Sequence, residues 1–339
     1  MPWTPKKVPF MLNLRKSLSA AAVAVALCSS PALAGNGRDQ LKALPKDAAG
    51  VLVVNVEQLA KSPLFQDLYK MATSNPQAQA GLAEFGKLIG MEPLAAVKTL
   101  AVGLPKGFAG QGLVLLQTSA DPKKIEAAAT QAGMSAKETF NGATLLKAND
   151  GSTLGLLGAQ IFLGSNEQVK GGVGAAKGKG ASMEKNADLM KLVNAAPQSQ
   201  DAWFAARIEN APPGELAHAK SLRGGVDLEK GVTVQLVVTM DSDAEAKKLA
   251  DESKAQLDKA KNEPQAKMLG LDAIAGKVTF AQKAKDVEIK IPLDEADVGR
   301  LKSTIGMMMM MANGAAAGGM QGGPPGGMPM QMPAPPAQH

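Results

Sequence analysis

One order of elements occurs twice in this chain of 339 residues. Residues 113–129 and 234–250 each read as an apolar strand, a short turn, a capping Asp or Ser and an amphipathic helix. In the second copy Val234, Leu236 and Val238 alternate with polar residues, which is the period of a strand with one buried face. The repeated unit therefore predicts a sheet that buries one side against helices.

The elements around these two copies also correspond. Similar apolar strands open the two halves, at 50–56 and 201–208, and a helix is predicted after each of them, including a short one at 215–222. Further strands are predicted over 98–104, 112–118, 139–148, 153–163, 225–229, 232–240, 277–282 and 286–293. The order β-α-β-β-α-β predicts two tandem, similar ferredoxin-like α+β domains with antiparallel sheets. The alternative is that two unrelated α+β domains share a common element order.

Composition shifts set the expected boundaries. We expect a first domain at 45–176, a connection at 177–199, a second domain at 200–305 and a tail at 306–339. The Gly-rich stretch 171–182 resembles a phosphate loop, but Val173 stands where a glycine is needed and Gly180 where a Ser or Thr is needed. A flexible linker is the interpretation that this stretch favours.

The first 34 residues have the three parts of a secretory signal. A basic start without acidic residues precedes the apolar run 19–27, and Ala32 and Ala34 are small residues at the two positions before a cleavage at Gly35. Met1 and Met11 both fit as the first residue. The run is too short to cross a bilayer, so we expect an exported protein, periplasmic or at the cell surface.

Removal of this signal changes what the chain can bind. Four of the 37 basic and none of the 31 acidic residues lie within it, so the mature net charge falls from +6 to about +2. That balance gives no basic surface for nucleic acid. The only cysteine, Cys28, is removed with the signal, and its preceding residues do not form a lipidation motif. No later segment is apolar enough for a membrane span.

Two blocks carry a resemblance to other proteins. The segments are VLVVNVEQLAKSPLF, residues 51–65, and the block from Phe140 to Val173 that begins FNGATLLKANDG. With the signal that precedes them, they resemble a group of uncharacterised exported bacterial proteins. The resemblance implies export and an α+β architecture with a duplicated domain, and it implies no activity.

The tail differs from the rest of the chain. Residues 306–339 contain no Lys, Arg, Asp or Glu, and Met307–Met311 is an unbroken run followed by Gly, Ala, Pro and Gln. This composition predicts disorder and a methionine-rich contact surface. A sharper alternative is a Cu(I) site, because thioethers are soft ligands. The candidate ligands are Met328, Met330, Met332 and His339.

Catalytic patterns are weak in this sequence. His218 is the only internal histidine, no Gly-x-Ser-x-Gly elbow accompanies it, and the mature chain has no cysteine. We therefore predict a non-catalytic binding or scaffolding protein of the cell envelope, without a cofactor, that contacts an unidentified envelope protein through strands or a sheet face. The alternatives are Cu(I) handling by the tail and a small-ligand or lipid carrier with a pocket between the domains.

Overall fold

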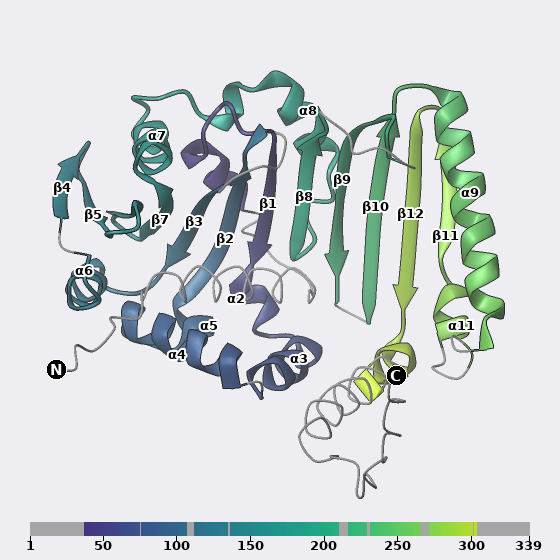
Figure 1. Cartoon of the computed structure of the whole chain (residues 1–339), viewed down its shortest axis with the longest axis horizontal. Helices are drawn as coiled ribbons and strands as arrows, with labels where there is room; N and C mark the ends of the chain where they lie inside the picture. The colour runs from purple at the N-terminus through teal and green to yellow at the C-terminus, as the bar shows by residue number, and fades with distance from the viewer. Residues whose placement is uncertain are drawn as a thin grey trace, which may run out of the picture.

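A computed structural model describes residues 37–300 and 302–303, apart from 75, 107–111, 135, 210–215, 229–230, 265–266 and 268–270. Its described strands form one antiparallel sheet in the order β11-β12-β10-β9-β8-β1-β2-β3-β7-β6-β5-β4. Helices pack on this sheet from both halves of the chain (Figure 1). The α+β class with antiparallel strands is therefore confirmed.

The first half supplies seven strands and most of the helices. Its strands are β1 Gly50–Asn55, β2 Val97–Leu104, β3 Leu113–Thr118, β4 Ala136–Phe140, β5 Ala143–Lys147, β6 Ser152–Leu157 and β7 Gln160–Ser165. Its helices are the 3-10 helix η1 Arg38–Ala43, then α2 Val56–Leu59, α3 Pro63–Thr73, α4 Pro76–Ile89, α5 Pro93–Ala96, α6 Pro122–Gln131 and α7 Asn166–Ala176. The expected caps are present, since Ser62, Asp121 and Ser165 each accept a backbone N–H at the start of a helix.

The second half is smaller. The 3-10 helix η3 Met183–Lys185 and α8 Ala187–Ala195 lead into it. Its strands are β8 Ala202–Arg207, β9 Ala219–Asp227, β10 Val232–Met240, β11 Thr279–Lys283 and β12 Asp286–Leu293. Its helices are α9 Asp243–Asn262 and α11 Leu271–Ala275, and residues 295–300 and 302–303 are helical after Asp294. Ser242 caps α9 as its sequence predicts.

Both halves share one strand order, and they meet in the middle of the sheet. β1, β2 and β3 are neighbours, as are β8, β9 and β10, and the later strand β7 or β12 returns to pair with the third strand of its half. β1 pairs antiparallel with β8, so the two halves form one continuous sheet. The ferredoxin-like arrangement is wrong, because a split β-α-β unit would place another strand between β1 and β2, which here pair directly.

Three local predictions also change. The helix expected at 215–222 is wrong, since Ala219–Leu222 already belong to β9, where Leu222 pairs with Val238. The single strands expected at 139–148 and 153–163 are hairpins instead. Asn141 and Gly142, both with positive φ, turn β4 into β5, and Gly158, also with positive φ, lies in the turn between β6 and β7.

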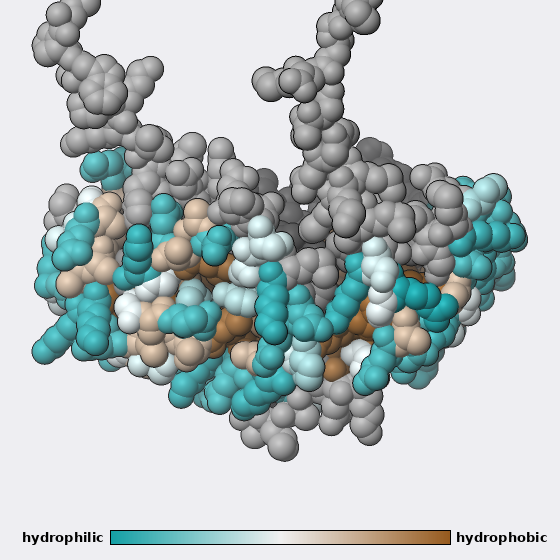
Figure 2. Space-filling view, turned by 90° about the horizontal axis from the view of Figure 1, so that it is seen from below, coloured by the Kyte–Doolittle hydropathy of each residue, from teal (hydrophilic) through white to brown (hydrophobic). Residues whose placement is uncertain are grey.

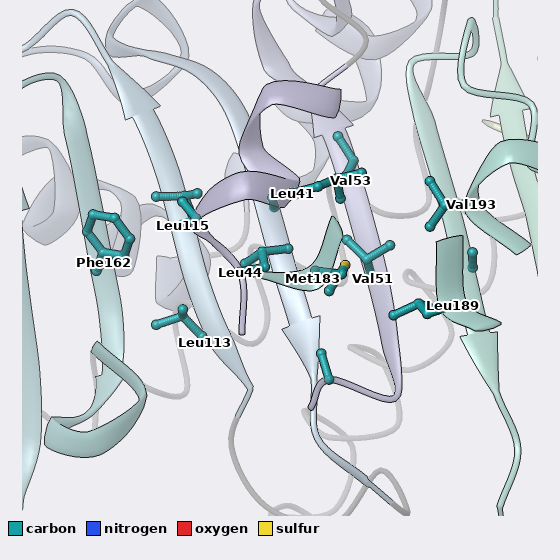
Figure 3. Close-up of a cluster of buried hydrophobic side chains, with 14 of the residues drawn as sticks. Leu41, Leu44, Val51, Val53, Leu113, Leu115, Phe162, Met183, Leu189 and Val193 are labelled. Carbon is teal, nitrogen blue, oxygen red and sulfur yellow. The ribbon is translucent and has the colours of Figure 1, made fainter. Parts of the chain in front are cut away.

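A dry core lies on one face of the sheet, which we call face A and define by Val51, Val53 and Trp203. The 3-10 helix η1, α7, η3 and α8 cover it. Figure 3 shows Leu41, Leu44, Met183, Leu189 and Val193 from these elements directed at the strands. The connection before β8 is therefore part of the core, because α8 buries Leu189 and Val193 completely.

The flexible linker expected from residue 171 onward is also wrong. Residues 171–176 are the second half of α7, and Gly172 is buried. A Cβ on Gly172 would stand 2.6 Å from a methyl carbon of Leu113 and 3.0 Å from the ring of Phe162. The glycines of this stretch therefore allow a helix to approach the sheet closely.

Face B, defined by Leu52, Val54 and Phe204, carries two separate covers. In the first half the elements α2 to α6 bury Val54, Leu116 and Ile161. In the second half α9 buries Val238 and Val287 near the other end of the strands. The strip between these two covers is the region described next.

Candidate functional site: an apolar row across face B

A row of apolar side chains crosses nine neighbouring strands on face B. Its members are directly opposite one another in the printed strand pairing, so the row runs across the sheet at the level of Leu52. We call it the apolar row. It consists, from β7 to β11, of Leu163, Val114, Val102, Leu52, Phe204, Gly224, Leu236, Ile289 and Phe280.

The side chains of the apolar row are only half-buried. Gly224 is buried, whereas the eight apolar members all keep part of their surface exposed. The parallel row one step along the strands is different, since Ile161, Leu116 and Val54 at its first-half end are at most 3% exposed beneath helices. Half-burial is thus confined to the strip between the two helical covers. Figure 2, viewed from the lower side of Figure 1, shows apolar surface reaching the outside between charged side chains.

Gly224 joins the two halves of the row. A Cβ at this position would meet the ring of Phe204 at 3.0 Å and the carbonyl oxygen of Gln235 at 2.3 Å. The ring of Phe204 therefore lies beside the glycine, in space that any other residue would fill. As a result the apolar surface is continuous from Leu52 on β1 to Leu236 on β10, despite the missing side chain on β9.

Face A of the second half is polar at the corresponding strands. Arg223 donates to Asp286 at 2.6 Å, and Thr239 donates to the other oxygen of Asp286 at 2.7 Å. Gln235 donates to Glu288 at 2.8 Å. Burial alone would raise the pKa of Asp286, but the hydrogen bonds from Arg223 and Thr239 outweigh it and lower the pKa. These groups satisfy one another, so this face is a solvated surface built from cross-strand pairs.

His218 lies in a turn before β9 and not on a helix. Its Nδ1 is 3.0 Å from a carboxylate oxygen of Asp241, and the imidazole is about half exposed. The hydrogen bond from His218 lowers the pKa of Asp241. Asp241 also has a hydrogen bond with Ser242, whose hydroxyl already accepts the N–H of Glu245 as a helix cap. The order His–Asp–Ser places the carboxylate in the middle, so this group lacks the nucleophile–base contact of a hydrolytic triad.

Several predicted sites lie outside the described residues. They are the cleavage residues Ala32, Ala34 and Gly35, and the Cu(I) candidates Met328, Met330, Met332 and His339. Within the described part of the chain, no group of three His, Cys, Asp or Glu side chains is placed to hold a metal ion. Over the same residues, no helix combines the length and the apolar character that a membrane span requires. The copper alternative and the export signal stay predictions.

Comparison with known proteins gives distant matches in fold alone. No protein-family model and no curated protein matches this chain. Among solved structures, crystal form I of TP0453 is similar with a TM-score of 0.45 and crystal form IV with 0.42, both at 10% identity. Each covers 78% of this chain, and 96% and 95% of the respective TP0453 chain. These values describe a distant likeness and carry no information about function.

Part of the apolar row was present in the sequence patterns. The alternation of Val234, Leu236 and Val238 and that of Val287, Ile289 and Ile291 are confirmed as one face of β10 and β12. Sequence patterns do not show which of these residues a helix covers. The mechanism expected from sequence, contact through a sheet face, has in this row a defined set of residues.

Proposed function

We propose that this chain is an exported, non-catalytic binding protein of the cell envelope, and that the apolar row holds an amphipathic helix of a partner protein. The observation that carries the proposal is the register of eight half-buried apolar side chains across nine strands. Contiguous exposed apolar surface of this kind marks binding sites.

The dimensions of the row favour a helix as its occupant. Neighbouring strands are about 4.8 Å apart, so eight intervals give a strip of about 38 Å. A helix of about 25 residues has that length at 1.5 Å per residue. An α-helix is also the element that already covers both neighbouring parts of face B, through α6 near Leu146 and through α9 near Val238. A partner helix with an apolar stripe would complete the same layer.

The shared strand order of the two halves supports a further part of the proposal, that the chain arose by duplication of a β-β-β-α-β-β unit. In that interpretation the apolar row is composed of one segment from each copy, joined at the β1–β8 pair. A partner helix that crosses this pair contacts both copies at once. The binding surface therefore belongs to the joined sheet rather than to either half.

The test measures binding of a synthetic amphipathic helix. The probe has about 25 residues with Leu on one stripe and Lys and Glu elsewhere, and it is titrated against the chain that begins at Gly35. Leu236→Thr places a hydroxyl in the row, and we expect it to weaken binding about tenfold, equal to about 1.4 kcal/mol. The matched control is Val237→Thr, the next residue on β10, which faces away from the row and should change affinity less than about twofold.

Two outcomes would overturn the proposal. One is equal weakening by both variants, which would mean that the effect comes from loss of sheet stability and not from the row. The other is saturable binding of a long-chain fatty acid that depends on Leu236 while the peptide does not bind. That result would make the row a lipid carrier site instead. Circular dichroism of both variants establishes that each is folded before titration.

A further inference from the structure

The last described residues of the chain are fixed against the first half. Lys302 forms an ion pair of 2.7 Å with Asp67 on α3, and its side chain is mostly buried. The helical residues before it follow directly from β12, whose Ile289 belongs to the apolar row. The chain therefore leaves the described fold between β12 and α3, at the end of the sheet where α3 and α4 cover face B.

The segment that continues from this point has an unusual composition. The 36 residues from Thr304 to His339 contain no Lys, Arg, Asp or Glu and include nine methionines. Met307 is five residues beyond Lys302, a distance that the chain can span to at most about 18 Å. An uncharged, methionine-rich segment thus starts within reach of a half-buried apolar strip.

We propose that the segment 304–339 is the resident occupant of the apolar row, and that its methionine side chains, beginning with Met307–Met311, cover the row until a partner displaces them. This inference rests on the proposed function, since it describes how the same surface is regulated. The segment brings no charge that contact with the row would desolvate. Methionine is unbranched and adapts to irregular apolar surfaces, and its sulfur interacts favourably with aromatic rings such as Phe204 and Phe280.

Covalent attachment makes a weak contact effective. A tethered segment has an effective concentration in the millimolar range, so even a contact with a dissociation constant near 0.1 mM would keep the row about 90% occupied. The apparent affinity of an added helix would fall in proportion to the fraction of chains with an open row. The tail would therefore act as a competitor built into the chain.

The first experiment compares the chain 35–339 with the chain 35–303, using the same amphipathic probe peptide. We expect removal of the tail to raise the affinity for the peptide about tenfold. Addition of a separate 304–339 peptide to the shortened chain should restore competition at high concentration. Equal affinity of the two chains for the probe would overturn the tail proposal and leave the proposed function standing. Absence of probe binding to the shortened chain would remove the proposed function.

The second experiment follows the tail directly and does not depend on a partner. Methyl signals of isotope-labelled methionines in the chain 35–339 report ring currents from a nearby phenylalanine. We expect Phe204→Leu to shift tail methionine signals, and the control Phe140→Leu, on edge strand β4 beside Lys170, to leave them unchanged. Tail signals that coincide with those of the separate 304–339 peptide would overturn the proposal. Shifts with Phe204→Leu without any probe binding would support the tail contact alone.

Discussion

The two halves of the sheet have the same strand order but different surroundings. In the first half, helices cover face A through η1 and α7 and face B through α2 to α6, so β1 and β3 are buried on both sides. In the second half α9 covers part of face B, whereas face A carries the polar network around Arg223 and Asp286. One topology can therefore support a two-sided core or a one-sided sheet, and the side chains along each strand decide which it becomes.

The largest expected effect separates the two cores. Phe162 is completely buried between β7 and α7, so Phe162→Ala should lower the free energy of unfolding by about 3–5 kcal/mol. Leu236→Ala removes a half-buried side chain from the one-sided half and should cost less, about 1–2 kcal/mol. Urea unfolding followed by circular dichroism measures both. Equal losses for the two variants would contradict the distinction between a two-sided and a one-sided sheet.

The sequence encodes much of this difference. β1 reads GVLVVN, a continuous apolar run, whereas β10 reads VTVQLVVTM, which alternates over most of its length. These are the patterns of strands buried on two faces and on one. Helix starts were also predictable, because Ser165 with Gln168 and Ser242 with Glu245 place an acceptor where the first backbone N–H groups need it.

Other features needed the assembled chain. The pairing of β1 with β8 joins residues about 150 positions apart, and no local pattern records it. The helix predicted at 215–222 failed because Leu222 obtains its burial from Val238 and Ala206 on neighbouring strands, which overrides local helix propensity. The Asn141–Gly142 turn, by contrast, had a readable signal in the Asn-Gly pair. The apolar row combines side chains from eight strands, so its continuity follows only from the strand register.

A smaller effect is expected from the polar face of the second half. Arg223 is 16% exposed and Asp286 33% exposed, so their ion pair is partly screened by water. We expect Asp286→Asn to lower the free energy of unfolding by about 1 kcal/mol. A double-mutant cycle with Arg223→Met separates the pair from the loss of each group by itself. The control is Lys247→Met, whose pair with Asp251 on α9 is exposed and should contribute less. A contribution from Lys247 as large as that from Asp286 would contradict the assignment of this network to the stability of the one-sided sheet.

The smallest and most specific effect concerns pH at the end of the second half. The hydrogen bond from Lys277, followed by the N–H of Asp297, lowers the pKa of Asp294 from 3.8 to about 2. A carboxylate whose pKa is lower in the folded state stabilises the fold above pH 4, and this contribution disappears as the pH falls through 2. Asp294 also caps the helical residues that carry Lys302 to Asp67, so its protonation should loosen the contact between the two halves at α3. We expect Asp294→Asn to be less stable than the unmodified chain at pH 7 and to approach it between pH 4 and pH 2, as measured by urea unfolding at each pH. A difference that stays constant over this interval would mean that the carboxylate contributes through geometry and not through its charge.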